Sequence, residues 1–112
     1  MTLAMRRVVL FTRNLDKMAT FYRDVLRLPP RRGGSELIEF DAGGCFIALH
    51  SGSSAVGKRA PKLVFYSKNV EATRDELVAR GAKLGRVMSG PGLTRCEGKD
   101  PDGNPFQISN RA

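Results

Sequence analysis

The sequence predicts an α+β fold built from two tandem βαβββ modules. Three observations support this prediction. A segment of nine residues occurs twice at an offset of 55 residues, each copy has the pattern of a strand followed by a helix, and further strand-like segments joined by turns follow each helix. An internal repeat of this kind indicates two copies of one structural unit, and we therefore consider it first.

The repeat matches residues 8–16 to residues 63–71, which belong to the same chemical class at nine consecutive positions. Two of these positions are identical, Val9 with Val64 and Asn14 with Asn69. We therefore expect module 1 at about residues 5–52 and module 2 at about residues 61–110. Residues 51–61, which are rich in Ser, Gly and Ala, form the expected linker.

Each copy begins with a predicted strand, at residues 8–11 and 63–66, whose β-branched and aromatic residues indicate burial on both faces. Asn14 and Asn69 follow at the positions of helix N-caps, where a side-chain oxygen accepts hydrogen bonds from the first turn. Both copies therefore predict a strand that leads directly into a helix.

The two helices end at recognisable residues. The first has apolar residues at helical spacing and ends before Pro29 and Pro30, because proline cannot continue a helix. The second has a weaker apolar stripe and ends at Gly81, which can adopt a positive φ. That weaker stripe consists of Val70, Thr73, Leu77 and Val78.

Strand-like segments joined by turns follow the helices. The turns lie at residues 41–44, 90–92 and 100–104, and each contains glycine, with proline as well in the last two. Five strands are predicted around them, at residues 36–40, 45–50, 83–88, 94–98 and 105–110.

Length and composition limit the possible classes of protein. The 112 residues suffice for one compact domain, so we expect residues 1–112 to form a single domain. The sequence contains no apolar run long enough to cross a bilayer, and its first residues do not have the pattern of a signal peptide. We therefore expect a cytoplasmic protein with no membrane partner. Cys45 and Cys96 lack C-x-x-C spacing and are expected as free, buried or half-buried thiols.

The net charge of +8 raises the possibility of nucleic-acid binding. However, the basic pairs lie in separate segments with acidic residues between them, and no stacking aromatic residues alternate with them. We therefore expect no nucleic-acid partner and interpret the charge as a solvated basic surface that helps to capture anionic small molecules. The three pairs are Arg6–Arg7, Arg31–Arg32 and Lys58–Arg59.

Segments along nearly the whole chain, from about residue 6 to residue 110, resemble the vicinal oxygen chelate superfamily. This superfamily includes glyoxalases, bleomycin resistance proteins and extradiol dioxygenases. The resemblance is carried by VVLFTRNL at residues 8–15, FYRDVL at 21–26, EFDAGG at 39–44, FIALH at 46–50 and DPDGNPFQI at 100–108. One departure is Arg27, which stands where the family usually ends its first helix with glycine.

The resemblance implies that the two modules form a curled mixed sheet with a ligand cleft and with the helices on its outer face. In the family this half-open cleft often holds a divalent metal on four strand positions, usually occupied by His, Glu, His and Glu. Here these positions are Arg7, Ala48, Lys62 and Gln107. A guanidinium and a methyl group have no lone pair to give, and an ammonium has one only after losing its proton. Because only Gln107 could coordinate a cation, we predict that these positions hold no metal and that the protein uses no cofactor.

Strand alternation predicts which side chains line the cleft with Arg7. Arg7 can hold a carboxylate or phosphate through a bidentate fork, and Lys62 adds a point charge. As an alternative, both side chains extend into solvent or pair with nearby acidic residues. The predicted ligand-binding residues are Arg7, Val9, Phe11, Phe46, Ala48, His50, Lys62, Tyr66 and Gln107.

Other residues with chemical potential are few. His50, the only histidine, is a candidate acid or base, although a histidine at a strand end more often contacts solvent or a hydrogen-bond partner. Glu36, Glu39 and Asp41 form an acidic stretch that is either a source of metal ligands or a solvated strand edge.

These observations predict a metal-free protein that binds a small, anionic or amphipathic molecule in the cleft. The alternative is an enzyme, namely a glyoxalase-type lyase or isomerase or a dioxygenase, that uses a non-standard metal site or His50 as acid and base. A third hypothesis is a module that binds nucleic acid or protein. The resemblance also implies a homodimer, whose clefts lie either within one chain or between two chains.

Overall fold

The computed structural model describes residues 7–52 and 62–111. The chain divides into two compact units, Met1–Val56 and Gly57–Ala112, which correspond to the two predicted modules. Most of the predicted linker, residues 53–61, lies outside the described residues, as does the start of module 1. That the two modules share one domain stays a prediction.

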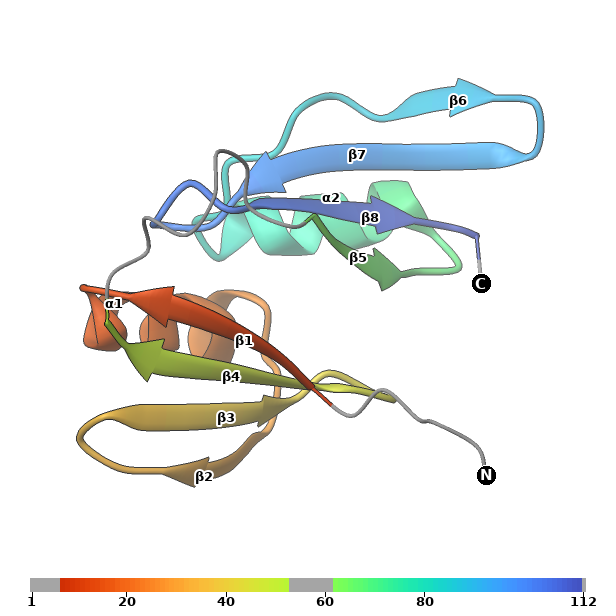
Figure 1. Ribbon diagram of the computed structural model, residues 1–112. Coiled ribbons are helices and arrows are strands. Elements are labelled where there is room, and N and C mark those ends of the chain that lie inside the picture. The colour runs from red at the N-terminus through yellow and green to blue at the C-terminus, as the bar shows by residue number, and fades with distance from the viewer. Residues whose placement is uncertain (1–6, 53–61, 112) are drawn as a thin grey trace, which may run out of the picture. The chain divides into compact units, whose positions relative to one another are not determined.

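The first unit contains a four-stranded mixed sheet in the order β1-β4-β3-β2, in which β1 and β4 are parallel and the other neighbours are antiparallel. Its helical segments contact β3 and β4 (Figure 1). The elements are β1 (Arg7–Thr12), α1 (Leu15–Thr20), the π-helix η1 (Phe21–Val25), β2 (Pro30–Gly33), β3 (Leu37–Asp41) and β4 (Phe46–Ser51).

The second unit repeats this topology with the order β5-β8-β7-β6, and β5 and β8 are its parallel pair. The helix α2 contacts β7 and β8 (Figure 1). The elements are β5 (Leu63–Tyr66), α2 (Val70–Ala79), β6 (Met88–Gly90), β7 (Leu93–Lys99) and β8 (Pro105–Ser109). The α+β class and the tandem βαβββ modules are therefore confirmed.

Alternate residues of a strand point to opposite faces of the sheet. The helices cover one of these faces in each unit, and the apolar core lies there. In the first unit the buried residues come from three strands and from the helical segment: Leu10, Met18, Ala19, Tyr22, Phe40, Ile47 and Leu49. In the second unit they are Val70, Leu77, Ala82, Cys96, Phe106 and Ile108. Val78, which was expected in the helical stripe, is 41% exposed.

The prediction that the first strand of each module is buried on both faces is wrong. The exposed fractions are 41% for Val9, 43% for Phe11, 56% for Val64 and 59% for Tyr66. A helix covers only one face of each sheet, so these side chains lie on the opposite, open face.

The first helix differs from the prediction at both ends. Asn14 occupies the N-cap position but makes no side-chain cap hydrogen bond, and its backbone N–H donates to Thr12 Oγ1. Asn69 does cap α2, since its side chain accepts from the backbone N–H of Ala72. At the far end the helix widens into a π-turn, and Arg27 follows with a φ of 58° before the two prolines.

Two strands lie where the sequence pattern did not place them. β2 begins at Pro30, one of the two prolines expected to stop the helix. The strand expected at residues 83–88 forms only an isolated bridge between Leu84 and Gly98, and β6 begins at Met88. Proline is tolerated at the first residue of an edge strand, which explains β2.

Within the described residues, the helices are too short to pass through a membrane as an apolar span.

Candidate functional site

The open face of the β1–β4 sheet brings together the six ligand-binding residues predicted in the first module. They lie on two adjacent parallel strands in three opposed pairs: Arg7 with Phe46, Val9 with Ala48, and Phe11 with His50. Ala48 is 1% exposed, whereas Val9 and Phe11 are half-exposed. The face is therefore an apolar and aromatic floor with a guanidinium at one end and an imidazole at the other.

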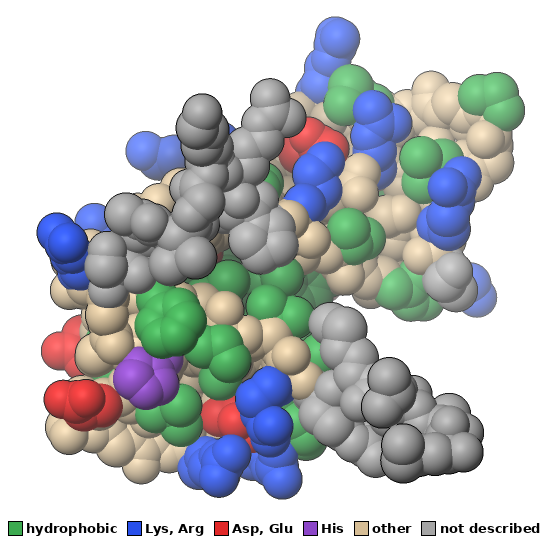
Figure 2. Space-filling model, in the orientation of Figure 1, with side chains coloured by type: hydrophobic (Ala, Val, Ile, Leu, Met, Phe, Trp, Pro, Cys, Tyr) green, Lys and Arg blue, Asp and Glu red, His purple; other side chains and the backbone are tan. Residues whose placement is uncertain are grey.

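A cluster of three arginines surrounds one buried carboxylate at the cationic end of this face. Glu39 lies on β3 opposite Ala48, and its side chain is only 1% exposed. Arg7 Nε donates to Glu39 Oε2 at 3.2 Å, Arg32 Nη2 to the same oxygen at 3.2 Å, and Arg31 Nη1 to Oε1 at 2.9 Å. We call these four residues the Glu39 cluster. Figure 2 shows Lys and Arg side chains gathered around an acidic one over this sheet.

The cluster carries more positive than negative charge. Burial would raise the pKa of Glu39, but hydrogen bonds and charge interactions with Arg32 and Arg7 outweigh it, so the pKa lies below its ordinary value. Glu39 is thus an anion that three cations face, which leaves an excess of two positive charges. The Arg31 guanidinium also lies over the Phe46 ring, with 4.0 Å from Cζ to the ring centroid, and so makes a cation–π contact.

His50 lies at the other end of the open face. Its Nδ1 is 2.8 Å from the carbonyl oxygen of Ser51, and an acceptor of that kind requires the proton on Nδ1. In the neutral ring Nε2 therefore keeps a lone pair. The ring also contacts Phe11 in a tilted arrangement, with 5.4 Å between the centroids. His50 is positioned as a hydrogen-bond acceptor or a base beside an aromatic surface.

The second module has a related arrangement on its own open face. Lys62 Nζ donates to Glu97 Oε1 at 2.9 Å, and the side-chain amide of Gln107 lies 3.5 Å from the same oxygen. Arg95 Nε is 4.0 Å from that oxygen. Val64, Gln107 and Glu97 are opposed in register, as Val9, Ala48 and Glu39 are in the first module. The Tyr66 side chain is exposed on this face.

The residues at the four positions that the family resemblance assigns to a metal do not fit one here. Arg7 and Lys62 are each engaged as cations with a glutamate. Ala48 is buried and has no donor atom, so Gln107 alone offers an oxygen. Elsewhere in residues 7–52 and 62–111, His, Cys, Asp and Glu form no group of three that could hold a metal ion.

Arg31, Arg32 and Glu39 were not predicted as site residues. The basic residues were interpreted as scattered, but three of them meet at one carboxylate. Glu39 was interpreted as part of a metal-ligand source or a solvated edge, and it is instead buried. The signal that could have found them is the stretch from Gly33 to Ser35, a turn between two short strands that pairs Arg32 with Glu39.

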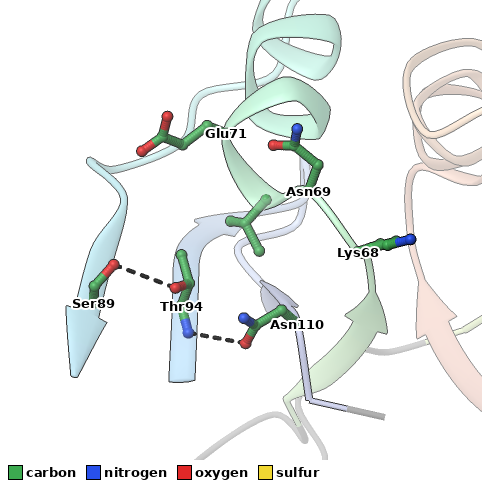
Figure 3. A pocket seen from close by; sticks show the side chains of 7 residues that line it. Lys68, Asn69, Glu71, Ser89, Thr94 and Asn110 are labelled. Atoms are coloured by element: carbon green, nitrogen blue, oxygen red, sulfur yellow. Dashed lines mark hydrogen bonds between the residues drawn. The ribbon is translucent and has the colours of Figure 1, made fainter. Parts of the chain in front are cut away.

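An open depression of about 480 Å³ lies beside the first turn of α2 in the second module (Figure 3). Its polar groups already contact one another: Asn110 Oδ1 accepts from the Thr94 backbone N–H, and the Ser89 and Thr94 hydroxyls are 3.3 Å apart. The N-terminal backbone of the helix is capped by Asn69 and followed by Glu71. These contacts make it a weaker candidate than the Glu39 cluster.

A model of a known protein family matches this chain. The model of the Glyoxalase/Bleomycin resistance protein/Dioxygenase superfamily matches residues 4–108, nearly the whole chain. The chain belongs to this superfamily. No curated protein matches it.

Solved structures of the superfamily have the same fold. A lactoylglutathione lyase from Agrobacterium tumefaciens is 21% identical with a TM-score of 0.79, over 95% of this chain and 92% of that one. A glyoxalase/bleomycin resistance protein/dioxygenase from Nocardioides is 15% identical with a TM-score of 0.81, over 97% of this chain and 83% of that one. At these identities the likeness concerns the fold alone.

Proposed function

We propose that this member of the superfamily binds a small anionic or amphipathic molecule on the open face of the β1–β4 sheet, without a metal at Arg7, Ala48, Lys62 and Gln107. The observation that carries the proposal is the Glu39 cluster, in which three exposed arginine side chains share one buried carboxylate. A cluster with excess positive charge attracts an anion, and arginine binds carboxylates and phosphates with a fixed geometry.

The apolar floor next to the cluster supports an amphipathic ligand. Val9 and Phe11 are half-exposed, and the Phe46 ring lies under the Arg31 guanidinium. Small-molecule sites are mostly apolar with a few placed polar groups, and this face has that composition. An aromatic carboxylate would place its charge at the arginines and its ring along the sheet.

Calorimetric titration with benzoate tests the proposal. We expect wild-type protein to bind benzoate and Arg7→Ala to bind it at least about tenfold more weakly, because a charge-assisted hydrogen bond is lost. Arg86→Ala is the matched control, since Arg86 is exposed and lies in the second module. Equally weak binding by wild type and Arg7→Ala would contradict the proposal.

His50 favours a second candidate function, a glyoxalase-type lyase or isomerase or a dioxygenase. Its Nε2 lone pair beside Phe11 is suited to proton transfer. Elemental analysis of dialysed protein separates the two candidates: stoichiometric zinc, nickel, manganese or iron would favour the enzyme. A turnover that His50→Gln abolishes, while Arg7→Ala keeps it, would also favour the enzyme.

The proposal includes a cytoplasmic homodimer with neither a membrane nor a nucleic acid as partner. The exposed apolar side chains of Val64 and Tyr66, on the open face of the second sheet, support an association with a second copy. Light scattering coupled to size-exclusion chromatography would measure the mass, and a monomer at micromolar concentration would contradict the dimer.

A further inference from the structure

The Glu39 cluster has donors left over after its internal ion pairs are made. Glu39 uses one nitrogen of each guanidinium: Nε of Arg7, Nη1 of Arg31 and Nη2 of Arg32. A guanidinium carries five N–H donors, so each arginine keeps most of its donors for another acceptor. These side chains are 40%, 47% and 61% exposed, whereas the carboxylate beneath them is 1% exposed. The remaining donors therefore face solvent above a buried anion.

The charge of the cluster selects the charge of its ligand. Three cations facing one anion keep an excess of two positive charges, and like charges this close repel one another. A ligand with one negative charge leaves the cluster cationic, whereas a ligand with two neutralises it. Asp41 lies on the same face of β3, but its Oδ1 accepts from the Gly43 backbone N–H in the hairpin loop.

The geometry favours an oxyanion with three terminal oxygens. All three guanidinium groups contact one carboxylate, so they are close enough for a second small anion to contact more than one of them. A carboxylate offers two oxygens, and a phosphate monoester offers three strong acceptors and a charge near −2.

We infer that the Glu39 cluster binds a dianionic oxyanion of the phosphate monoester class, with Arg7, Arg31 and Arg32 as its ligands and Glu39 as a fixed counter-ion. This inference rests on the proposed function and deepens it. It assigns to Arg31 and Arg32, on the edge strand β2, the discrimination between doubly and singly charged ligands.

Calorimetry with phenyl phosphate and benzoate, in a tris-type buffer at constant ionic strength, tests the inference. At pH 8 we expect phenyl phosphate to bind at least about tenfold more tightly than benzoate. The second pKa of a phosphate ester is about 6, so at pH 5 the preference should shrink to less than about threefold. Benzoate keeps one charge over this range. A difference between its affinities at pH 8 and pH 5 would therefore measure the contribution of protein groups such as His50, which lies on the same face.

Two variants locate the effect. Arg32→Gln removes the most exposed arginine of the cluster and should weaken phenyl phosphate about tenfold but benzoate less than about threefold. The matched control Arg86→Gln makes the same charge change in the second module and should alter neither affinity. Glu39→Gln raises the excess charge and should tighten phenyl phosphate at pH 8, which loss of folding could not do.

The outcomes separate the inference from the function on which it rests. Equal affinities for the two ligands at pH 8, both weakened by Arg7→Ala, would overturn the dianion preference and leave the anion site standing. Binding of neither ligand would overturn both. A phosphate preference that survives Arg32→Gln unchanged would place the dianion away from the cluster and overturn the inference.

Discussion

Arg7 reaches Glu39 across an intervening strand: Nε on β1 donates to Oε2 on β3 at 3.2 Å, and β4 lies between them. The residue of β4 directly opposite Glu39 is Ala48, whose methyl group leaves room for the contact. In the second module Lys62 reaches Glu97 across β8 in the same way. The pairing of a cation with a glutamate two strands away is therefore a feature of the repeat.

The Glu39 cluster predicts a loss of stability in acid. The pKa of Glu39 is lower in the folded protein than in the unfolded chain, so its contribution to the free energy of unfolding is present above the unfolded value of about 4.3. That contribution is lost as the pH falls through the lower folded pKa. We expect Glu39→Gln to flatten the decrease in urea midpoint below about pH 4.

The control for this prediction is Glu36→Gln. Glu36 is exposed and makes no ion pair within the described residues, so its substitution should leave the acid dependence as in the wild type. If both variants keep the wild-type slope, the buried carboxylate is not coupled to folding.

The small side chain of Ala48 predicts a penalty for a larger one. Leucine at this position would overlap the space through which Arg7 reaches Glu39, and Ala48 is 1% exposed. We expect Ala48→Leu to destabilise the protein by about 1–3 kcal/mol, as overpacking does. Ala79→Leu, at an exposed position near the end of α2, should change the free energy of unfolding by less than about 0.5 kcal/mol. Urea unfolding measures both, and equal values would refute the steric explanation.

The repeat is the reason that the fold could be predicted from the sequence. Residues 8–16 and 63–71 define two copies of the same strand and helix, and the glycine-containing turns mark most of the later strands. β2 was not predicted, because Pro30 was interpreted only as the end of the helix, and the strand is held by tertiary pairing with Glu39 and Ile38. The first strands were assigned to burial on both faces because apolar composition alone does not distinguish an open binding face from a core.

Only part of the candidate site could be predicted from local sequence patterns. Alternation along β1 and β4 places Arg7, Val9 and Phe11 on one face, and the structure shows them there. Arg31 and Arg32 required knowledge of β2, and their common partner Glu39 required knowledge of the register between β2, β3 and β4. Contacts between strands are not encoded in local periodicity, and the turn at residues 33–35 was the one local signal for the pairing of Arg32 with Glu39.

The backbone of Arg27 predicts a stabilising substitution. Its φ of 58° lies in the left-handed region, which costs a residue with a Cβ atom about 1–2 kcal/mol. Arg27→Gly removes the Cβ atom, and Arg27→Ala removes the rest of the side chain but keeps it. We expect the glycine variant to be more stable than the alanine variant by about 1 kcal/mol. Thermal unfolding of the two variants gives the difference directly, and a more stable alanine variant would contradict the strain.

Gly98 on β7 predicts a packing penalty of a different origin. A Cβ atom there would lie 2.7 Å from Leu84 Cδ2 and 2.8 Å from the carbonyl oxygen of Lys83. Because a backbone oxygen cannot move as a side-chain end can, we expect Gly98→Ala to cost about 1–3 kcal/mol. Gly90→Ala on the neighbouring strand β6 is the control, since a Cβ atom there meets nothing within 4 Å. Chemical denaturation should show a lower midpoint for the first variant alone.

The two free thiols should differ in reactivity. Cys96 is buried in the core of the second module, and burial is the main cause that raises the pKa of its thiol above the ordinary value. Cys45 is half-exposed before β4, where its thiol lies 3.6 Å from the Phe46 carbonyl oxygen.

Since the thiolate is the reactive form, we expect a thiol reagent to modify only Cys45 at neutral pH in the native protein, and both residues in denaturant. Peptide mapping after labelling identifies the site, with Cys45→Ser as the control that should remove native labelling. Labelling of Cys96 at a similar rate would show that the core of the second module opens readily.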